Sequence, residues 1–161
     1  MKRKRQEMSW MMDRFRDVLR SSGAKLTPQR VEIYRETART CDHPDIAVIF
    51  RNVRKSMPTV SLDTVYRALD LFKRLGLVNA LRPDETQMRF DADIRPHHHF
   101  ICVRCGLTRD VFDRTLDRLE IPASAKGLGR VDSAHVALKG LCSNCLKGRE
   151  ETAMNGDNPV E

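Results

Sequence analysis

Residues 61–76 read SLDTVYRALDLFKRLG, and this stretch decides the fold of the first half of the chain. Its apolar side chains recur at intervals of three or four residues, which is the spacing of an amphipathic helix. Ser61 is a good N-cap and Gly76 is a good C-terminal stop, so both ends of the helix are indicated. The apolar stripe consists of Leu62, Val65, Leu69, Phe72 and Leu75. The residues off this stripe, expected to face outward, are Thr64, Tyr66 and Arg67.

Three helices are expected before this stretch. Met11–Leu19 has apolar residues at helical spacing. Thr27 before Pro28 predicts the start of a second helix. Its buried face would consist of Val31, Ile33, Tyr34 and Ala38. Asp45 predicts the cap of a third helix, whose apolar stripe would be Ile46, Ile49, Phe50 and Val53.

After Gly76 the pattern changes to two short strand-like segments, residues 77–81 and 87–90, on either side of a turn at residues 82–85. Small helices followed by a hairpin predict a winged helix-turn-helix over residues 12–91. In such a module the helix after the turn enters the major groove of DNA.

The chain is basic, with 29 lysines and arginines against 22 acidic residues, and residues 1–11 form a basic N-terminal arm. This excess favours binding to a polyanion, although such charges also solvate ordinary helix faces. The sequence contains neither a long apolar run nor the pattern of a secretion signal. We therefore expect a cytoplasmic protein without a membrane partner.

The second half indicates a separate α/β domain over residues 92–149, which gives the whole chain an α+β class. Strand-like runs occupy residues 100–103, 108–112 and 131–141, with a helix expected at Arg114–Ala125. Residues 150–161 are polar and lack apolar periodicity, so we expect a disordered tail.

Two CxxC pairs indicate a metal site in this second domain. They are Cys102, Cys105, Cys142 and Cys145. Paired cysteines at this spacing are typical of structural zinc with four thiolates, a closed site without hydrolytic chemistry. The alternative is a disulfide or unrelated thiols, but a cytoplasmic chain is kept reduced. Cys41 is left over and is assigned no role.

A second group of side chains carries nitrogen and oxygen donors, which suit iron, manganese or zinc. It comprises His43, Asp91, His97, His98, His99 and Asp110. In an extended segment His97 and His99 point to one side and His98 to the other, so an alternating pair can share an ion. The alternative is that the three histidines form a solvated loop.

These motifs together resemble the ferric uptake regulator family of bacterial metal-dependent repressors over residues 12–147. The resemblance rests on LTPQR, His43, TVYRAL, RFD, HHHFICVRCG and the second CxxC pair. It implies a winged helix, an α/β dimerisation domain and repression of operator DNA by a homodimer. It also implies that a regulatory Fe(II) or Mn(II) is bound by His43, Asp91, His97, His99 and Asp110.

The carboxylate positions favour one branch of this family. Peroxide-sensing members tend to carry aspartate there and iron-responsive members glutamate, and Asp91 and Asp110 are both aspartate. By this resemblance, hydrogen peroxide is the signal, and His43 and His97 are the histidines oxidised. Arg67 instead resembles the iron-responsive branch, which remains the alternative.

DNA contacts are expected from Ser61, Thr64, Tyr66 and Arg67.

A third metal site of some relatives is not expected, because Pro96 replaces a histidine and His135 is one residue out of register. A zinc enzyme using His97 and His99 is a different function class, but the sequence has no HExxH or nucleophile motif. We expect no catalytic residues and no small-molecule substrate apart from peroxide as a signal.

Overall fold

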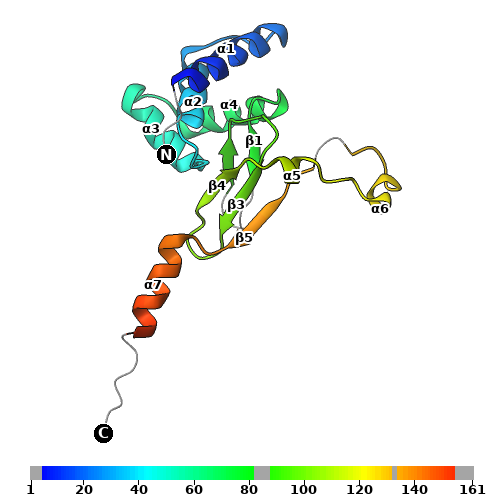
Figure 1. Ribbon diagram of the computed structural model, residues 1–161. Coiled ribbons are helices and arrows are strands. Elements are labelled where there is room, and N and C mark those ends of the chain that lie inside the picture. Colours follow the sequence, from blue (N-terminus) through cyan, green and yellow to red (C-terminus); the bar gives the residue numbers. More distant parts are fainter. Residues whose placement is uncertain (1–4, 82–87, 132–133, 155–161) are drawn as a thin grey trace. The chain divides into compact units, whose positions relative to one another are not determined.

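The computed structural model describes residues 5–81, 88–131 and 134–154, and the chain divides into two compact units, Met1–Arg95 and Pro96–Glu161 (Figure 1). The first unit contains helices α1 (Arg5–Ser21), α2 (Pro28–Ala38), α3 (Ile46–Ser56) and α4 (Leu62–Arg74), then strands β1 (Asn79–Leu81) and β2 (Arg89–Asp91). The second contains β3 (His98–Cys102), β4 (Thr108–Val111), α5 (Arg114–Asp117), α6 (Ala123–Lys126), β5 (Ala137–Gly140) and α7 (Ser143–Met154). Helices followed by a hairpin confirm the expected winged-helix class.

The N-caps of three helices are the ones indicated by the sequence. Thr27 accepts a hydrogen bond from the Arg30 amide at 3.3 Å, Asp45 from the Val48 amide, and Ser61 from the Thr64 amide. Each cap satisfies a backbone donor that the first turn of the helix leaves open. The predicted starts of α2, α3 and α4 are thus confirmed.

Helix α1 begins at Arg5, well before the predicted start at Met11. Its first turns contain no glycine or proline, Glu7 favours the positive end of the helix dipole, and Met8 packs against the core. The part of the expected N-terminal arm that the structure describes is therefore helical. Lys2, Arg3 and Lys4 lie outside the described residues.

Three aromatic rings form the centre of the first unit. Phe15 of α1 stacks on Tyr34 of α2 with ring centroids 4.3 Å apart, and Phe72 of α4 meets both rings edge-on. All three are buried, and such paired rings stabilise a core beyond the area they bury. Leu62 was expected in the buried stripe of α4, but it is 41% exposed because it occupies the first turn, beyond the reach of the core.

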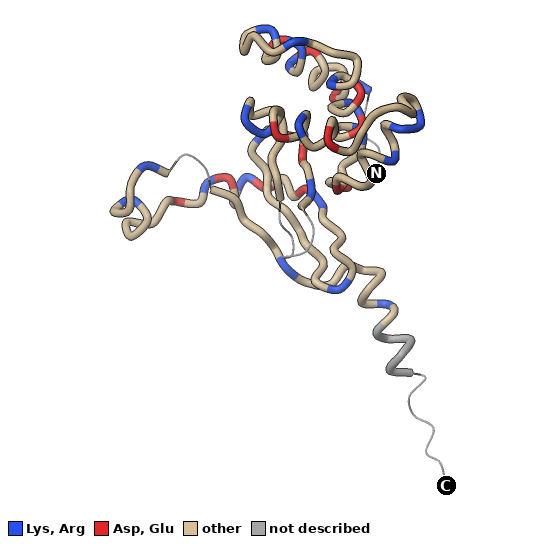
Figure 2. Tube along the Cα trace, turned by 180° about the vertical axis from the view of Figure 1, so that it is seen from behind, with Lys and Arg blue, Asp and Glu red and all other residues tan. Residues whose placement is uncertain are grey.

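The hairpin pairs β1 with β2 in antiparallel register, with Asn79 opposite Asp91. The turn predicted at residues 82–85 lies outside the described residues. Lysine and arginine positions are distributed along the helices of this unit (Figure 2). Among them, α3 carries Arg51, Arg54 and Lys55 and no acidic residue.

The second unit is built on a three-stranded sheet in the order β4-β3-β5. Strand β3 pairs antiparallel with β4 and parallel with β5, so the segment carrying the histidines lies at its centre. The prediction of one helix over Arg114–Ala125 is wrong, because the structure has two short helices in this region, α5 and α6. Pro122 lacks an amide proton and disfavours helical geometry in the residue before it, which separates α5 from α6.

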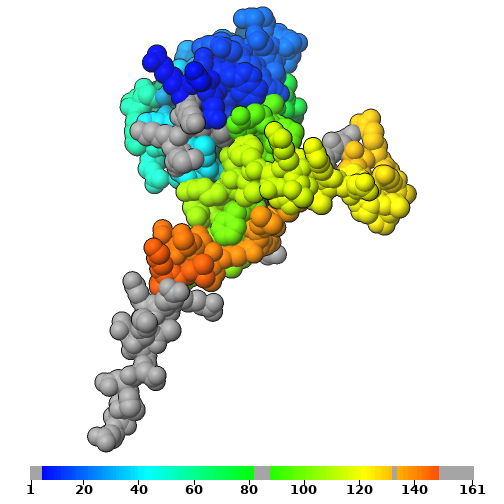
Figure 3. Space-filling view, viewed as in Figure 1, coloured from blue at the N-terminus to red at the C-terminus, as the bar shows by residue number. Residues whose placement is uncertain are grey.

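Two segments of the second unit lie outside the sheet, the one around α6 and the C-terminal helix α7. The α6 segment extends away from the sheet of its own unit (Figure 1) and forms a separate lobe in the space-filling view (Figure 3). Leu128, two residues after α6, is 92% exposed. Helix α7 ends at Met154, so residues 150–154, which were expected to belong to a disordered tail, are helical. Residues 155–161 lie outside the described part. None of the described helices has the length and apolar character that crossing a bilayer requires.

Candidate metal centres and DNA-reading helix

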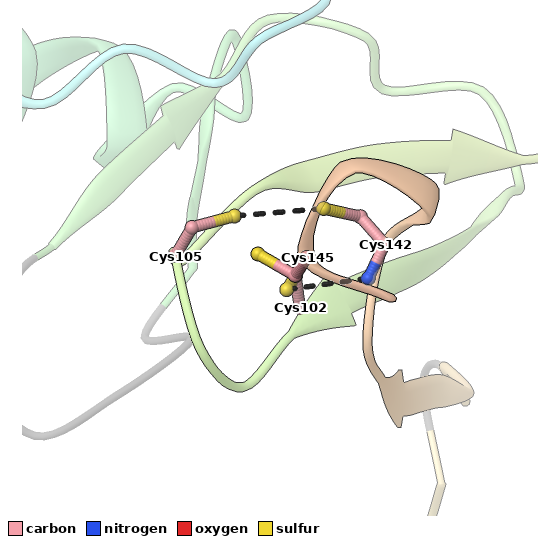
Figure 4. Close-up of side chains that lie close together, drawn as sticks. All are labelled: Cys102, Cys105, Cys142 and Cys145. Atoms are coloured by element: carbon pink, nitrogen blue, oxygen red, sulfur yellow. Dashed lines mark hydrogen bonds between the residues drawn. The ribbon is translucent and has the colours of Figure 1, made fainter. Parts of the chain in front are cut away.

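The four paired cysteines meet in the second unit. Cys102 ends β3, Cys105 lies in the turn after it, Cys142 follows β5, and Cys145 lies in the first turn of α7. Their sulfurs all lie within 4.8 Å of one another (Figure 4). The Sγ atoms of Cys105 and Cys142 are 3.7 Å apart, far longer than a disulfide bond of about 2.05 Å. The cluster has the ligand number and type of a closed thiolate metal site.

Local geometry explains why the cysteines converge. Parallel pairing places Cys102 opposite Gly140, so the residues after β5 reach the end of β3. Gly106 has a φ of +68°, which suits glycine and lets the chain turn sharply after Cys105. The backbone amide of Cys142 donates a hydrogen bond of 3.3 Å to the Cys102 sulfur.

The protonation of this cluster is uneven. Amide hydrogen bonds from Cys142 and Cys105 lower the pKa of the Cys102 thiol from 9.0 to about 6. A hydrogen bond with the Cys142 sulfur, together with burial, raises the pKa of the Cys145 thiol to about 12. Cys102 is thus the thiol that ionises most readily, and its negative charge disfavours ionisation of the neighbouring Cys145 thiol. A divalent cation removes that repulsion and allows all four sulfurs to bind as thiolates.

A cluster of nitrogen and oxygen donors lies on the same sheet. His99 of β3 is directly opposite Asp110 of β4 in the register, and His97 precedes the strand on the same side. The Nε2 atoms of His97 and His99 are 3.0 Å apart, and His97 Nε2 is 3.6 Å from Asp110 Oδ1. The two imidazoles are buried, and the ring of Phe112 stacks on His97. These donors suit iron, manganese or zinc and differ from the soft thiolate set.

His98 points to the other side of the strand, as an extended segment requires. Its Nε2 is 3.2 Å from Asp117 Oδ1, and its Nδ1 accepts a hydrogen bond from the Val136 amide. The ring is therefore engaged on both nitrogens by its own unit. His135 lies nearby, with Nδ1 3.4 Å from the carbonyl oxygen of His97.

The first unit brings together the two remaining donors. His43 precedes α3 and Asp91 ends β2, and His43 Nε2 lies 3.7 Å from Asp91 Oδ2. Both side chains are almost completely buried. The backbone amide of Asp93 donates a hydrogen bond of 2.8 Å to Asp91 Oδ1, which fixes the orientation of that carboxylate. The His43 imidazole and the Asp91 carboxylate thus lie close enough to bind one metal ion together.

The four residues expected to contact DNA lie at the N-cap and in the first turns of α4. Ser61 and Thr64 bind each other at the N-cap, with their oxygens 2.8 Å apart. Tyr66 and Arg67 are exposed, and Arg67 Nε donates to Asp63 Oδ2 at 2.8 Å. The pairing of Asp63 with Arg67 was not predicted, although the spacing of four residues on a helix indicated it. Arg89 and Asp93, which support the first-unit donors, were missed as well.

Comparisons with known proteins agree with these features. A family profile described as the ferric uptake regulator family matches residues 21–137. The peroxide-responsive repressor PerR of Staphylococcus epidermidis is 32% identical over 129 residues, which cover 79% of this chain and 85% of that protein.

Solved structures share the fold. The ferric uptake regulator Fur of Helicobacter pylori has a TM-score of 0.70 at 21% identity, covering 86% of this chain and 93% of that one. The ferric uptake regulator from Francisella tularensis with iron has a TM-score of 0.64 at 25% identity, covering 77% and 96%. Because the profile spans most of the chain and the PerR relative exceeds 30% identity, this chain belongs to the ferric uptake regulator family of metal-dependent repressors.

Proposed function

We propose that this chain represses transcription by binding operator DNA as a homodimer, that a regulatory metal ion controls this binding, and that hydrogen peroxide is the signal. The observation that carries the proposal is the pair of chemically distinct clusters. The second unit brings together four cysteine sulfurs and, from other residues, the buried imidazoles of His97 and His99 with the Asp110 carboxylate, while the first unit pairs His43 with Asp91. Soft and harder donors select different metals, so one ion serves structure and another serves regulation.

The structural ion in this proposal is zinc, bound by Cys102, Cys105, Cys142 and Cys145. Four thiolates leave no open coordination position, so this ion contributes folding energy to the second unit. Because Cys102 ends the strand that begins at His98, zinc would also rigidify the segment that presents His97 and His99.

The regulatory ion is Fe(II) or Mn(II), bound by His43 and Asp91 of the first unit together with His97, His99 and Asp110 of the second. The donors of each unit are already buried and close together. An ion shared by both units would bias the equilibrium between arrangements that fit and do not fit two operator half-sites. A bias of a few kcal/mol is enough to switch DNA binding.

Peroxide sensing is supported by the two carboxylates and by the similarity to the peroxide-responsive repressor of S. epidermidis. Asp91 and Asp110 are the aspartates typical of the peroxide branch. A bound ferrous ion would supply redox catalysis for peroxide cleavage, and the two electrons that reduce the peroxide would come, in net terms, from the imidazole. In the net step one imidazole C–H of His43 or His97 gains an oxygen atom from H2O2, and the other peroxide oxygen leaves as water.

DNA reading is assigned to α4. Exposed Tyr66 and Arg67 would contact base edges, and Ser61 and Thr64 would lie close to the DNA at the N-terminus of the helix. The basic residues of α3 supply phosphate contacts. We place the protein in the cytoplasm because its proposed partner is operator DNA.

The dimer contact is assigned to the second unit. Several apolar side chains on or shortly after its strands and short helices are exposed. They include Phe112, Leu119, Leu128 and Leu138. Exposed apolar surface of this kind is typical of a protein interface, and a second copy of the chain is the partner that the family implies.

The test begins with DNA fragments selected from a random-sequence pool by the manganese-loaded protein. Their affinity is then measured for the iron-loaded and manganese-loaded protein, before and after hydrogen peroxide, at fixed salt. The proposal predicts that the iron form alone loses binding and gains one oxygen atom on a peptide containing His43 or His97. A peptide containing His135 serves as the internal control and stays unmodified.

The alternative is an iron-responsive repressor, which Arg67 favours because of its resemblance to that branch. It predicts that the iron form keeps its DNA affinity after peroxide and that its histidine peptides keep their mass. If neither metal changes DNA affinity, metal-dependent repression itself is contradicted for this chain.

A further inference from the structure

His43 has an unusual backbone conformation. Its φ is +49°, and among the described residues it is the non-glycine residue with a positive φ. A residue with a Cβ atom rarely adopts a positive φ, and it stays in this left-handed region only where the surrounding structure holds it. His43 is also almost completely buried. Something in the first unit must therefore hold this loop in place.

Arg89 of β2 provides that support. Its Nη1 donates a hydrogen bond of 3.2 Å to the His43 carbonyl oxygen and lies 3.5 Å from that of Asp42. The next residue along the strand continues the connection, because the Phe90 amide donates to the Pro44 carbonyl at 3.0 Å. A backbone bridge between Asp45 and Arg89 completes the attachment. The loop before α3 is thereby bound to β2 along its length.

The same strand carries the partner of the His43 ring. Arg89 and Asp91 are two residues apart, so their side chains leave β2 on the same face. Arg89 holds the backbone of His43 while Asp91 Oδ2 lies 3.7 Å from its imidazole. Asp93, whose amide fixes the other Asp91 oxygen, is itself held by two hydrogen bonds from the Arg95 side chain.

We propose that Arg89 is a positioning residue for the regulatory metal site, one that keeps His43 in its positive-φ conformation so that its imidazole faces Asp91. This inference rests on the proposed function, since it assigns a metal to these donors. Without the guanidinium, the loop relaxes toward a more common backbone conformation and the imidazole leaves the carboxylate. Because Asp45 caps α3 two residues after His43, the relaxation also reaches the start of that helix.

The test measures Mn(II) affinity, because manganese prefers oxygen and nitrogen donors and so reports on this site and not on the thiolates. Arg89→Ala is expected to weaken Mn(II) binding by about ten- to a hundred-fold, the usual effect of losing a residue that orients a ligand. Amide hydrogen exchange in residues 40–45 is expected to rise in the metal-free variant. Zinc content and far-UV circular dichroism should stay unchanged.

Arg14→Ala is the matched control, because Arg14 also donates to a backbone carbonyl of the first unit, that of Gly76, and does so away from His43. It should keep the parent Mn(II) affinity. Arg89→Lys is the milder variant for the case in which Arg89→Ala fails to fold. A lysine retains the charge but cannot reproduce the planar donor group, so a smaller loss of affinity is expected.

Two failures are distinguishable. If the parent protein binds neither Mn(II) nor Fe(II), or if His43→Ala binds Mn(II) as tightly as the parent, the proposed function fails. If His43→Ala loses Mn(II) while the folded Arg89 variants bind it like the parent, the positioning role of Arg89 is overturned.

Discussion

At the scale of the residue, the three consecutive histidines show how backbone geometry separates identical side chains. His97 and His99 have their Nε2 atoms 3.0 Å apart, whereas His98 contacts Asp117 and the Val136 amide on the opposite face. The alternation of an extended chain produces this division. It follows that His98 can be replaced without removing a donor from the cluster of His97, His99 and Asp110.

Replacing the single side chain of Arg67 tests the proposal that α4 reads DNA bases. Arg67→Ala is expected to lower operator affinity and also to reduce discrimination between the operator and mismatched DNA, because a base contact carries about 1–3 kcal/mol of discrimination. Fluorescence anisotropy with matched and mismatched fragments at one salt concentration measures both effects.

Arg74→Ala is the control for this change. Arg74 belongs to the same helix and is likewise paired with an aspartate four residues before it. Its replacement removes the same charge at the far end of α4, so it should weaken binding to all fragments alike. Equal discrimination by the Arg67 and Arg74 variants would show that α4 does not read bases through Arg67.

Side-chain contacts differ in how far the sequence predicts them. The pair Asp63 and Arg67 follows from helical spacing, since residues four apart are neighbours on a helix. The contact of Arg89 with the His43 carbonyl joins residues 46 positions apart, and no periodic pattern indicates it. The sequence thus indicates the metal donors by their chemistry but not the residues that orient them.

At the scale of the element, local signals were the most reliable. Thr27, Asp45 and Ser61 each cap a helix because their side chains bind an amide within the next three residues. The predictions failed in two places, one that depends on distant packing and one where the local signal of a proline was overlooked. The start of α1 is set by Met8 against the core, and the division of α5 from α6 by Pro122.

The aromatic cluster gives a stability prediction for these helices. Phe72→Ala removes the ring that contacts both Phe15 and Tyr34, and it is expected to lower the free energy of unfolding by about 3–5 kcal/mol. Leu62→Ala in the same helix is the control and should cost less than about 1 kcal/mol, because Leu62 is largely exposed. Urea unfolding followed by Trp10, the single tryptophan of the chain, reports on this unit. Equal losses in both variants would contradict the assigned core.

At the scale of the whole molecule, the two clusters have separate tasks under our proposal. The sulfurs stabilise the sheet of the second unit, and the imidazoles and carboxylates sense the metal. His43 and Asp91 belong to the first unit, whereas His97, His99 and Asp110 belong to the second. The central claim is that one ion uses donors from both units and thereby couples metal binding to DNA binding.

A double-mutant cycle on operator affinity tests this claim most directly. Operator affinity is measured with and without Mn(II) for the parent, His43→Ala, His97→Ala and the double variant, at fixed salt. If both histidines bind one ion, each single variant loses the manganese dependence and the double variant loses no more, because side chains acting as a unit are not additive. If His43→Ala keeps the manganese dependence of the parent while His97→Ala loses it, the ion is held by the second unit alone and the account is contradicted.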